Sequence, residues 1–469
     1  MPAHTGRVRR ALGRAIVDTG PLRRHPGFRR LWSGQLIASV GSQLTVVAVG
    51  YQTYRLTNST AMVGLVSLGQ LIPLLAGSLL GGPFVDAWDR RRVLMATQVL
   101  LAAGCTGLAV NAMLPHPLLW PMFACTAEAA AFQGVDWAAR RASVRHLVPG
   151  TDLAAALSLQ SAAFQFTLVV GPAAAGLLIA HTGLALVYGL NVVAYCIAFF
   201  FVARLPRLRP AGGGQRAGLA SLVGGVRYLR KSPPLAGAFM IDLGAMVFGM
   251  PRALFPELAV TLYGGGAATV GYLNAAVGLG ALTGSVLTGH VAGVRRPGRA
   301  VAVCVALWGL AITGFGLVPS LPAALVLLVV AGAADVVSSV FRAVIVQQVT
   351  PDAMQGRVNS LIFAGLQGGP RLGDAEAGAA AALAGPQFAA WSGGLLSVVT
   401  AIVTCWAIPQ FWRYRSDSGM AEPADQARAA GAGQAGPSGE DHAAPARQPA
   451  DRARSTGEAE PGPGGAKAT

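Results

Sequence analysis

Charged residues are scarce in this chain. Asp, Glu, Lys and Arg together make up 12% of its 469 residues, whereas a soluble domain carries about 25%. Hydrophobic residues make up 53%, and the mean hydropathy is +0.52, so the composition excludes an ordinary soluble globular domain. The short alternating segments of a membrane barrel are also lacking. This leaves a bundle of membrane-spanning helices, each of which satisfies its own backbone hydrogen bonds.

Cysteine and the common catalytic motifs are also in short supply. The five cysteines stand far apart, one in each of five apolar stretches: Cys105, Cys125, Cys196, Cys304 and Cys405. This spacing fits neither a metal site nor a disulfide framework. The sequence has no Gly-x-x-x-x-Gly-Lys-[Ser/Thr] loop for ATP, no His-Glu-x-x-His and no Gly-x-Ser-x-Gly. We therefore expect no enzyme activity, no metal and no cofactor, and a proton gradient as the energy source.

Long apolar stretches are what the chain has in abundance. About 20 apolar residues are enough for one helix to cross a bilayer. The stretches of this kind are 31–54, 61–84, 93–113, 118–139, 153–180, 184–202, 235–258, 269–291, 300–318, 323–346, 358–383 and 388–411. They predict an all-α membrane protein with twelve transmembrane helices.

Basic residues between these stretches fall almost entirely in alternate gaps. They include Arg90, Arg91, Arg92, Arg140, Arg141, Arg145, a long basic loop that ends with Arg230 and Lys231, and then Arg295, Arg296, Arg299 and Arg357. The opposite gaps carry no Lys or Arg except Arg55. Because positive loops stay in the cytoplasm, this asymmetry places both termini there. We interpret the net charge of +16 as this topology signal together with attraction to anionic lipid headgroups. Nucleic acid is not the expected partner, since aromatic residues are not interleaved with the basic ones.

Five regions follow from these patterns. They are a basic cytoplasmic N-terminus (1–30), a first six-helix bundle (31–203), a basic loop (204–233), a second six-helix bundle (234–413) and a disordered tail (414–469). The N-terminus has no cleavable leader, so the first helix is expected to be an uncleaved anchor. The central loop contains an amphipathic segment, which we expect on the inner leaflet. Two parallel six-helix halves are typical of an alternating-access transporter.

The loop after the second stretch carries a dense set of charges. Gly82 begins it, Asp86 follows, and Arg90 and Arg91 close it. A carboxylate at the end of a helix stabilises the N-terminus of a neighbouring helix, so Asp86 is expected to cap one. Arg90 and Arg91 would pair with such carboxylates or with lipid phosphate, and together these groups would lock an inner gate. The alternative for Arg91 is a topology charge alone.

A few carboxylates lie deep in the apolar stretches, where an ionisable group is costly and therefore a functional suspect. Glu128 is near the middle of the fourth stretch, and Asp242 and Asp335 lie in the seventh and tenth. We predict that these three bind protons or substrate, with a structural hydrogen-bonding role as the alternative for Glu128. Arg342 follows Asp335 by seven residues, on the same helix face.

Two further sets of opposite charges are close in sequence. Arg371 and Asp374 are three residues apart, a spacing at which helical side chains pair, and we predict a local ion pair. Arg252 and Glu257 lie toward the outer end of the seventh stretch and are candidates for an outer latch.

Several motifs resemble the major facilitator superfamily. Gly82-x-x-x-Asp86-x-x-x-Arg90-Arg91-Arg92 is similar to its signature loop, although Ala87 replaces a basic residue and Asp89 a glycine. The fifth stretch contains Gly171, Pro172 and Gly176, which resemble the Gly-Pro element of drug antiporters. Thr350-Pro-Asp-Ala-Met-Gln-Gly-Arg357 is typical of one exporter subgroup. Ala130 stands where related fourth helices have an arginine. The resemblance implies a monomeric exporter from the drug and siderophore branch.

Together these patterns predict a multi-pass protein of a bacterial plasma membrane. We expect it to export a mid-sized organic molecule by proton-coupled alternating access, with protons and anionic lipids as its other partners. An importer or uniporter is the alternative within transport, because direction does not follow from the residues. A non-transporting receptor with the same fold is disfavoured, since the intramembrane carboxylates Glu128, Asp242 and Asp335 are present.

Overall fold

A computed structural model describes residues 19–208, 219–288 and 294–415, and every regular element within these ranges is a helix. The described residues all fall in one compact unit, so the predicted division into two bundles stays a prediction. The first helices are α2 (Gly20–Arg24), α3 (Pro26–Thr57), α4 (Thr60–Gly69), α5 (Leu71–Ala87), α6 (Arg90–Met113), α7 (Trp120–Leu147), α8 (Gly150–Thr182) and α9 (Leu184–Ala203). The others are α10 (Leu219–Lys231), α11 (Pro233–Phe248), η1 (Pro251–Leu254), α12 (Phe255–Thr261), α13 (Ala267–Thr288), α14 (Pro297–Leu317), α15 (Leu321–Val349), α16 (Asp352–Ala384), α17 (Pro386–Ala407) and α18 (Pro409–Arg413).

Within the described residues, each of the twelve predicted stretches is mostly helical. Nine segments of the described residues are long and apolar enough to cross a membrane. The remaining three stretches correspond to α3, α7 and α16, which are helices of 32, 28 and 33 residues. The fold is therefore an all-helical membrane architecture, and twelve crossings with both termini inside stay a prediction.

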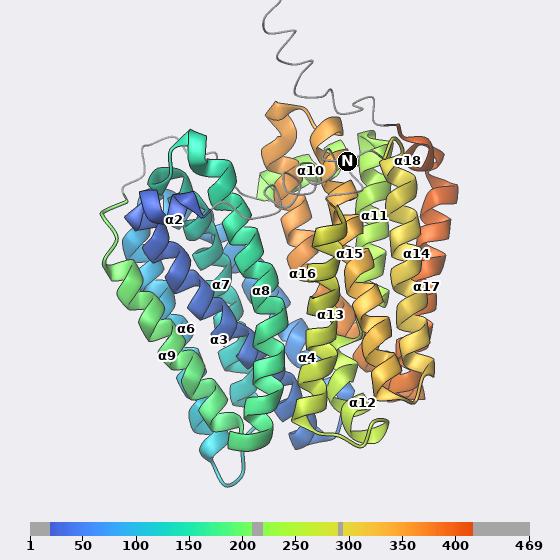
Figure 1. Cartoon of the computed structure of the whole chain (residues 1–469), viewed down its shortest axis with the longest axis horizontal. Coiled ribbons are helices and arrows are strands. Elements are labelled where there is room, and N and C mark those ends of the chain that lie inside the picture. Colours follow the sequence, from blue (N-terminus) through green and yellow to red (C-terminus); the bar gives the residue numbers. More distant parts are fainter. Residues whose placement is uncertain (1–18, 209–218, 289–293, 416–469) are drawn as a thin grey trace, which may run out of the picture. The chain divides into compact units, whose positions relative to one another are not determined.

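The helices pack as two groups that lie side by side (Figure 1). In the first group, α3 packs against α8 and α9, α6 against α7 and α9, and α5 against α7. In the second, α14 packs against α15 and α17, and α13 against α15. The main contacts between the groups are α8 with α13 and α4 with α16. We refer to the two ends of this arrangement as the α10 end and the α12 end, after the helices labelled there in Figure 1.

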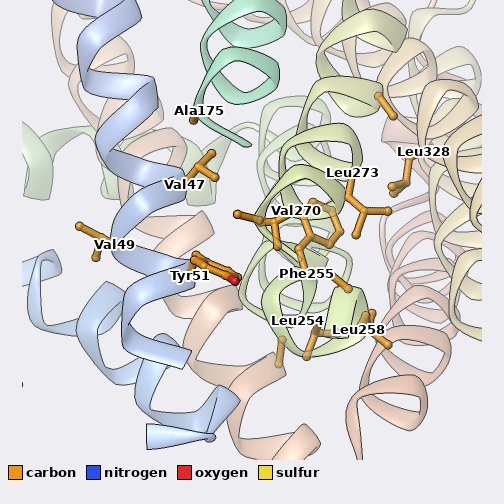
Figure 2. Packing of buried hydrophobic residues seen from close by; sticks show 14 of the residues in the cluster. Val47, Val49, Tyr51, Ala175, Leu254, Phe255, Leu258, Val270, Leu273 and Leu328 are labelled. Carbon is orange, nitrogen blue, oxygen red and sulfur yellow. The ribbon is translucent and has the colours of Figure 1, made fainter. Parts of the chain in front are cut away.

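The buried apolar side chains show how the two groups are joined. At the α12 end one cluster includes residues of both groups, with Tyr51 of α3 near Phe255 of α12 and Val270 of α13 (Figure 2). At the α10 end each group has a cluster of its own, around Phe28 in the first and Phe411 in the second. Because helices in lipid associate through close packing, the groups are held together chiefly at the α12 end.

Two of the predicted stretches are broken helices. The second changes from α4 to α5 at Gln70, three residues before Pro73, whose missing N–H leaves the carbonyl of Gly69 without its helical partner. The seventh is interrupted after α11 at Gly249 and resumes as η1 at Pro251. Trp308 donates its ring N–H to the Gly249 carbonyl at 3.1 Å. Such breaks occur at membrane depth only where protein or a cavity receives the freed backbone groups.

Helix α10 forms in the central loop, as its amphipathic pattern predicts. It packs against α16, where Gly225 lies next to the backbone of Arg357. The hydroxyl of Tyr228 donates to the Val349 carbonyl at 2.9 Å. Val223 and Val226 are exposed on this helix, so a side of α10 is left for the lipid contact that the sequence predicts.

Candidate functional site

A cavity of about 230 Å³ lies between the two helix groups. Its lining comes from α3, α4, α6, α7 and α9 of the first group and from η1, α12, α13 and α16 of the second. Both broken helices reach it, through Gln70 at the first break and Arg252 beyond the second. Irregular backbone beside a cavity in the membrane is typical of a ligand site. The cavity is therefore the candidate functional site.

Toward the α12 end, two hydroxyl–carboxylate hydrogen bonds join the groups. Ser67 of α4 donates to Asp374 of α16 at 2.5 Å, and Thr60 of α4 donates to Glu257 of α12. The helices touch closely here, since a Cβ at Gly378 would stand 2.9 Å from the Thr60 carbonyl oxygen. Hydrogen bonds to a charged group are stronger than neutral ones. These bonds therefore reinforce the contact between the two groups at the α12 end.

The two predicted local pairs take different partners in the fold. Arg371 donates to the carbonyl of Gln367 at 2.6 Å, while Asp374 accepts from Ser67. Neither Arg371–Asp374 nor Arg252–Glu257 is among the ion pairs of the described part of the chain. Both acids instead accept from the first helix group, a tertiary contact that spacing along one helix could not reveal.

On the other side of the cavity, an aromatic contact connects the groups. The rings of Trp137 in α7 and Phe363 in α16 are stacked with centroids 4.2 Å apart. The guanidinium of Arg141 lies 5.1 Å from the Trp137 ring, which adds a cation–π attraction. Trp137 is one helical turn from Gln133, a cavity-lining residue, on the side of the α10 end. The stacked rings thus stand between the cavity and the α10 end.

Asp242 and Asp335 come together in the second group. Arg342 of α15 lies 2.8 Å from the carboxylate of Asp242 in α11 and 3.6 Å from that of Asp335. The side chain of Asp335 is 48% exposed and that of Asp242 only 20%. One cation therefore balances two acids, of which Asp335 is the more accessible. These residues do not line the cavity described above, and their proton or substrate role stays a prediction.

Glu128 stands apart from the other acids. Its carboxylate lies against Gly104 of α6, where a Cβ would be 3.2 Å from Oε2. No hydrogen bond or ion pair of Glu128 occurs with the residues that the structure describes. Its neighbours Cys125 and Ala129 line the cavity, and Glu128 itself does not. A structural hydrogen bond is thus not seen, and proton binding stays a prediction.

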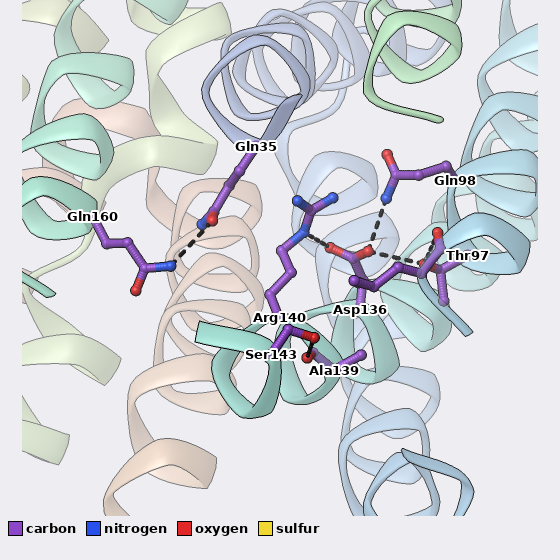
Figure 3. Close-up of polar contacts among 9 residues, drawn as sticks. Gln35, Thr97, Gln98, Asp136, Ala139, Arg140, Ser143 and Gln160 are labelled. Carbon is purple, nitrogen blue, oxygen red and sulfur yellow. Dashed lines mark hydrogen bonds and ion pairs between the residues drawn. The ribbon is translucent and has the colours of Figure 1, made fainter. Parts of the chain in front are cut away.

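Asp136 belongs to a buried polar network that was not predicted from the sequence. This residue of α7 accepts hydrogen bonds from Thr97 at 2.9 Å and Gln98 at 2.8 Å, both on α6, and pairs with Arg140 at 2.5 Å (Figure 3). The Arg140 side chain is only 6% exposed, so it is part of a buried network and more than a topology charge. The four-residue spacing of Asp136 and Arg140 was the available signal.

The signature loop is used within the first group. Arg90 is buried and its Nη1 lies 2.7 Å from the His146 ring, while Arg91 donates to the carbonyl of Ala203. Helix α5 runs through the positions of Gly82 and Asp86, but the surroundings of these two residues lie outside what the structure describes. The cap of α6 is Asp89, which accepts from the Arg91 N–H at 3.0 Å. Asp89 is therefore a capping residue that the sequence analysis overlooked, and the gate role stays a prediction.

The predicted Gly-Pro element forms the contact between α8 and α13. Pro172 leaves the Leu168 carbonyl without its helical partner, and this oxygen faces Gly278, where a Cβ would come within 2.5 Å. One turn on, a Cβ at Gly176 would stand 2.7 Å from the Ala267 oxygen. Gly171 lies against Gln43 of α3. The element thus allows close packing between the two helix groups.

A cavity shared by two groups of membrane-spanning helices defines the class of a membrane transporter. Solved structures support the fold. A mutant of the peptide transporter POT matches with a TM-score of 0.68 and 12% identity, over 84% of this chain and 96% of its own. A D-xylose–proton symporter matches with a TM-score of 0.64 and 16% identity, over 81% of this chain and 97% of its own.

Comparison by sequence gives the family. The family model described as transmembrane secretion effector matches residues 18–430. The enterobactin exporter EntS of Shigella boydii serotype 18 is 30% identical over 400 residues, 85% of this chain and 96% of that protein. The same exporter from Citrobacter koseri is 29% identical over equal shares. The chain belongs to the transmembrane secretion effector family, a branch of the major facilitator superfamily.

Proposed function

We propose that this transporter exports a mid-sized organic molecule across a bacterial plasma membrane by alternating access. The observation that carries the proposal is the asymmetry of the core: the groups share one apolar cluster at the α12 end and have separate clusters at the α10 end. A cavity lined by both groups lies between. Rocking about the cavity would open the α12 end only after the shared cluster and its two hydrogen bonds part.

In this proposal the α10 end faces the cytoplasm, as the basic gaps predict. Cargo enters the cavity past Trp137 and Phe363. Their stacking is a smaller contact between the groups than the shared apolar cluster at the α12 end. It leaves when Ser67 and Thr60 release Asp374 and Glu257. A siderophore is the favoured cargo because the relatives are enterobactin exporters; a drug-like compound is the alternative.

Proton coupling is the proposed drive. Asp242 and Asp335 share one arginine, so a proton on either acid changes the local charge balance. Glu128 has no competing partner among the described residues, which suits a group that takes up and releases a proton. We further propose that the protein acts as a monomer and that anionic lipids contact its basic loops.

Inverted vesicles containing the full chain test this function with enterobactin as the probe. We expect uptake that is faster when the vesicle interior is acidic, and that falls to the level of vesicles without the protein when the gradient is collapsed. Glu128→Gln and Asp86→Asn should each abolish uptake while leaving the amount of inserted protein unchanged. Enterobactin uptake only into right-side-out vesicles would indicate an importer, and gradient-independent equilibration would indicate a uniporter.

A further inference from the structure

The charged residues of the cavity wall are all on one side. Within the described lining they are Arg252 of η1 and Arg371 and Asp374 of α16, all from the second helix group. The rest of that lining is neutral, including all the residues from the first group. Two guanidinium groups and one carboxylate therefore share this wall. The resulting positive electrostatic potential, inside a confined site, favours a negatively charged ligand.

Asp374 is already engaged. Its Oδ2 accepts from Ser67 at 2.5 Å, and both arginines are near enough to interact with it electrostatically. A single carboxylate balances one of the two positive charges and leaves the other without a counter-charge in the described lining. A guanidinium group without a counter-charge beside a confined cavity attracts an anion, so a ligand anion would supply the charge that the described lining lacks.

The guanidinium groups have donors to spare. Arg371 uses Nη1 for the Gln367 carbonyl, and its Nε is buried without a partner in the described residues. The Arg252 side chain is exposed and forms no hydrogen bond or ion pair with the described part of the chain. The planar guanidinium group matches a carboxylate or similar oxyanion with paired N–H donors. Arg252 and Arg371 are thus equipped to hold oxygen anions.

The opposite wall suits a different part of the ligand. Val46, Leu108 and Tyr195 are among its apolar and aromatic residues from the first group, beside neutral polar ones such as Gln133 and Asn191. Apolar walls with a few converging polar groups bind the body of a small organic molecule. We propose that the cavity selects an organic anion with an aromatic or aliphatic body, whose acidic group binds between Arg252 and Arg371. The inference rests on the proposed function only in calling this anion the cargo.

A matched pair of probes tests the charge preference directly. Salicylate and salicylamide share one ring and differ in charge at neutral pH. Binding of each to the purified full chain in detergent is measured by titration calorimetry. We expect salicylate to bind about tenfold or more tightly than salicylamide, because hydrogen bonds to charged groups are the stronger ones. Equal affinities, preference for salicylamide, or no salicylate binding would overturn the inference.

Variants locate the preference. Arg371→Gln and Arg252→Gln should each reduce the preference for salicylate about tenfold, whereas Arg371→Lys should retain part of it. Arg204→Gln is the matched control, since Arg204 stacks on Phe200 outside the cavity, and it should change neither affinity. Arg252 is exposed, so its variant keeps the test valid if Arg371→Gln does not fold. An undiminished preference for salicylate in Arg252→Gln, or in a folded Arg371→Gln, would contradict the site.

Failure of this site and failure of the proposed function give different results. Charge-selective binding without any vesicle transport would leave the anion site intact and remove the exporter. Vesicle transport of enterobactin with no charge preference in binding would support the exporter and remove the anion site.

Discussion

Asp136 shows how much of a buried charge's role depends on neighbours that are distant in sequence. In the described structure it accepts from Thr97 and Gln98 and pairs with Arg140. In the sequence, Arg140 is only one of several basic residues in a gap between apolar stretches. The helical spacing of Asp136 and Arg140 was readable, but the two α6 donors were not, because they become neighbours only when α6 packs on α7.

At the residue scale, we predict that Asp136→Asn strongly destabilises the protein. Removing one partner of a buried pair leaves an uncompensated charge and costs about 3–5 kcal/mol. Thermal melting of the purified protein in detergent should show a clear drop. Asp152→Asn is the comparison, since Asp152 pairs with the 58% exposed Arg24 and with His25; a pair with an exposed arginine contributes about 1 kcal/mol or less, so the loss should be smaller. Similar melting of both variants would contradict the buried network.

Arg342 supports a second prediction at this scale. Arg342→Gln leaves Asp242 and Asp335 without their cation, so it should lower both thermal stability and vesicle transport. Adding Asp242→Asn removes the better-paired acid, at 2.8 Å, and should restore most of the stability but not the transport. Melting curves separate these effects from loss of folding. If the double variant is less stable than Arg342→Gln alone, the two groups do not act as a pair.

At the scale of elements, the sequence predicts the positions of the helices well because an apolar stretch and its flanking charges are local properties. The breaks after Gly69 and Gly249 were missed. A broken helix has the same hydropathy as a continuous one, so only Pro73 and Pro251 marked them. The consequence for the site is large, since Gln70 and Arg252 reach the cavity at or near these breaks.

Close approach of α8 and α13 gives the prediction for elements. Gly176→Ala places a methyl group 2.7 Å from the Ala267 oxygen and the Gly271 Cα, and overpacking of this kind costs about 1–3 kcal/mol. Gly189→Ala is the matched control because nothing lies within 4 Å of its added Cβ. It should be neutral or stabilise α9 slightly, since alanine favours helix. Melting temperatures of the two variants in detergent check this difference; equal values would contradict the packing.

For the whole molecule, the sequence indicated a polar site between two halves but could not assign its partners. Asp374 and Glu257 were expected to pair with arginines nearby in sequence, yet both accept from α4. A transporter that alternates between conformations packs different ends of its two groups together in each one. One sequence must be compatible with all these conformations. The shared core at the α12 end is therefore visible only in the folded arrangement of the helices.

The two cross-group hydrogen bonds give the last prediction. Cys125 lines the cavity, so a membrane-impermeant maleimide added outside intact spheroplasts should label it slowly while the α12 end is closed. Thr60→Val with Ser67→Ala removes both hydroxyl donors. Each bond to a carboxylate contributes about 1.5–3 kcal/mol, so the open population and the labelling rate should rise at least about tenfold. Peptide mass spectrometry separates Cys125 from the other cysteines.

Thr106→Val is the control for this prediction. It removes a hydroxyl whose hydrogen bond lies within its own helix, and it should leave the labelling rate unchanged. Labelling of Cys125 that is equally fast with and without Thr60 and Ser67 would show that these hydroxyls do not hold the α12 end closed.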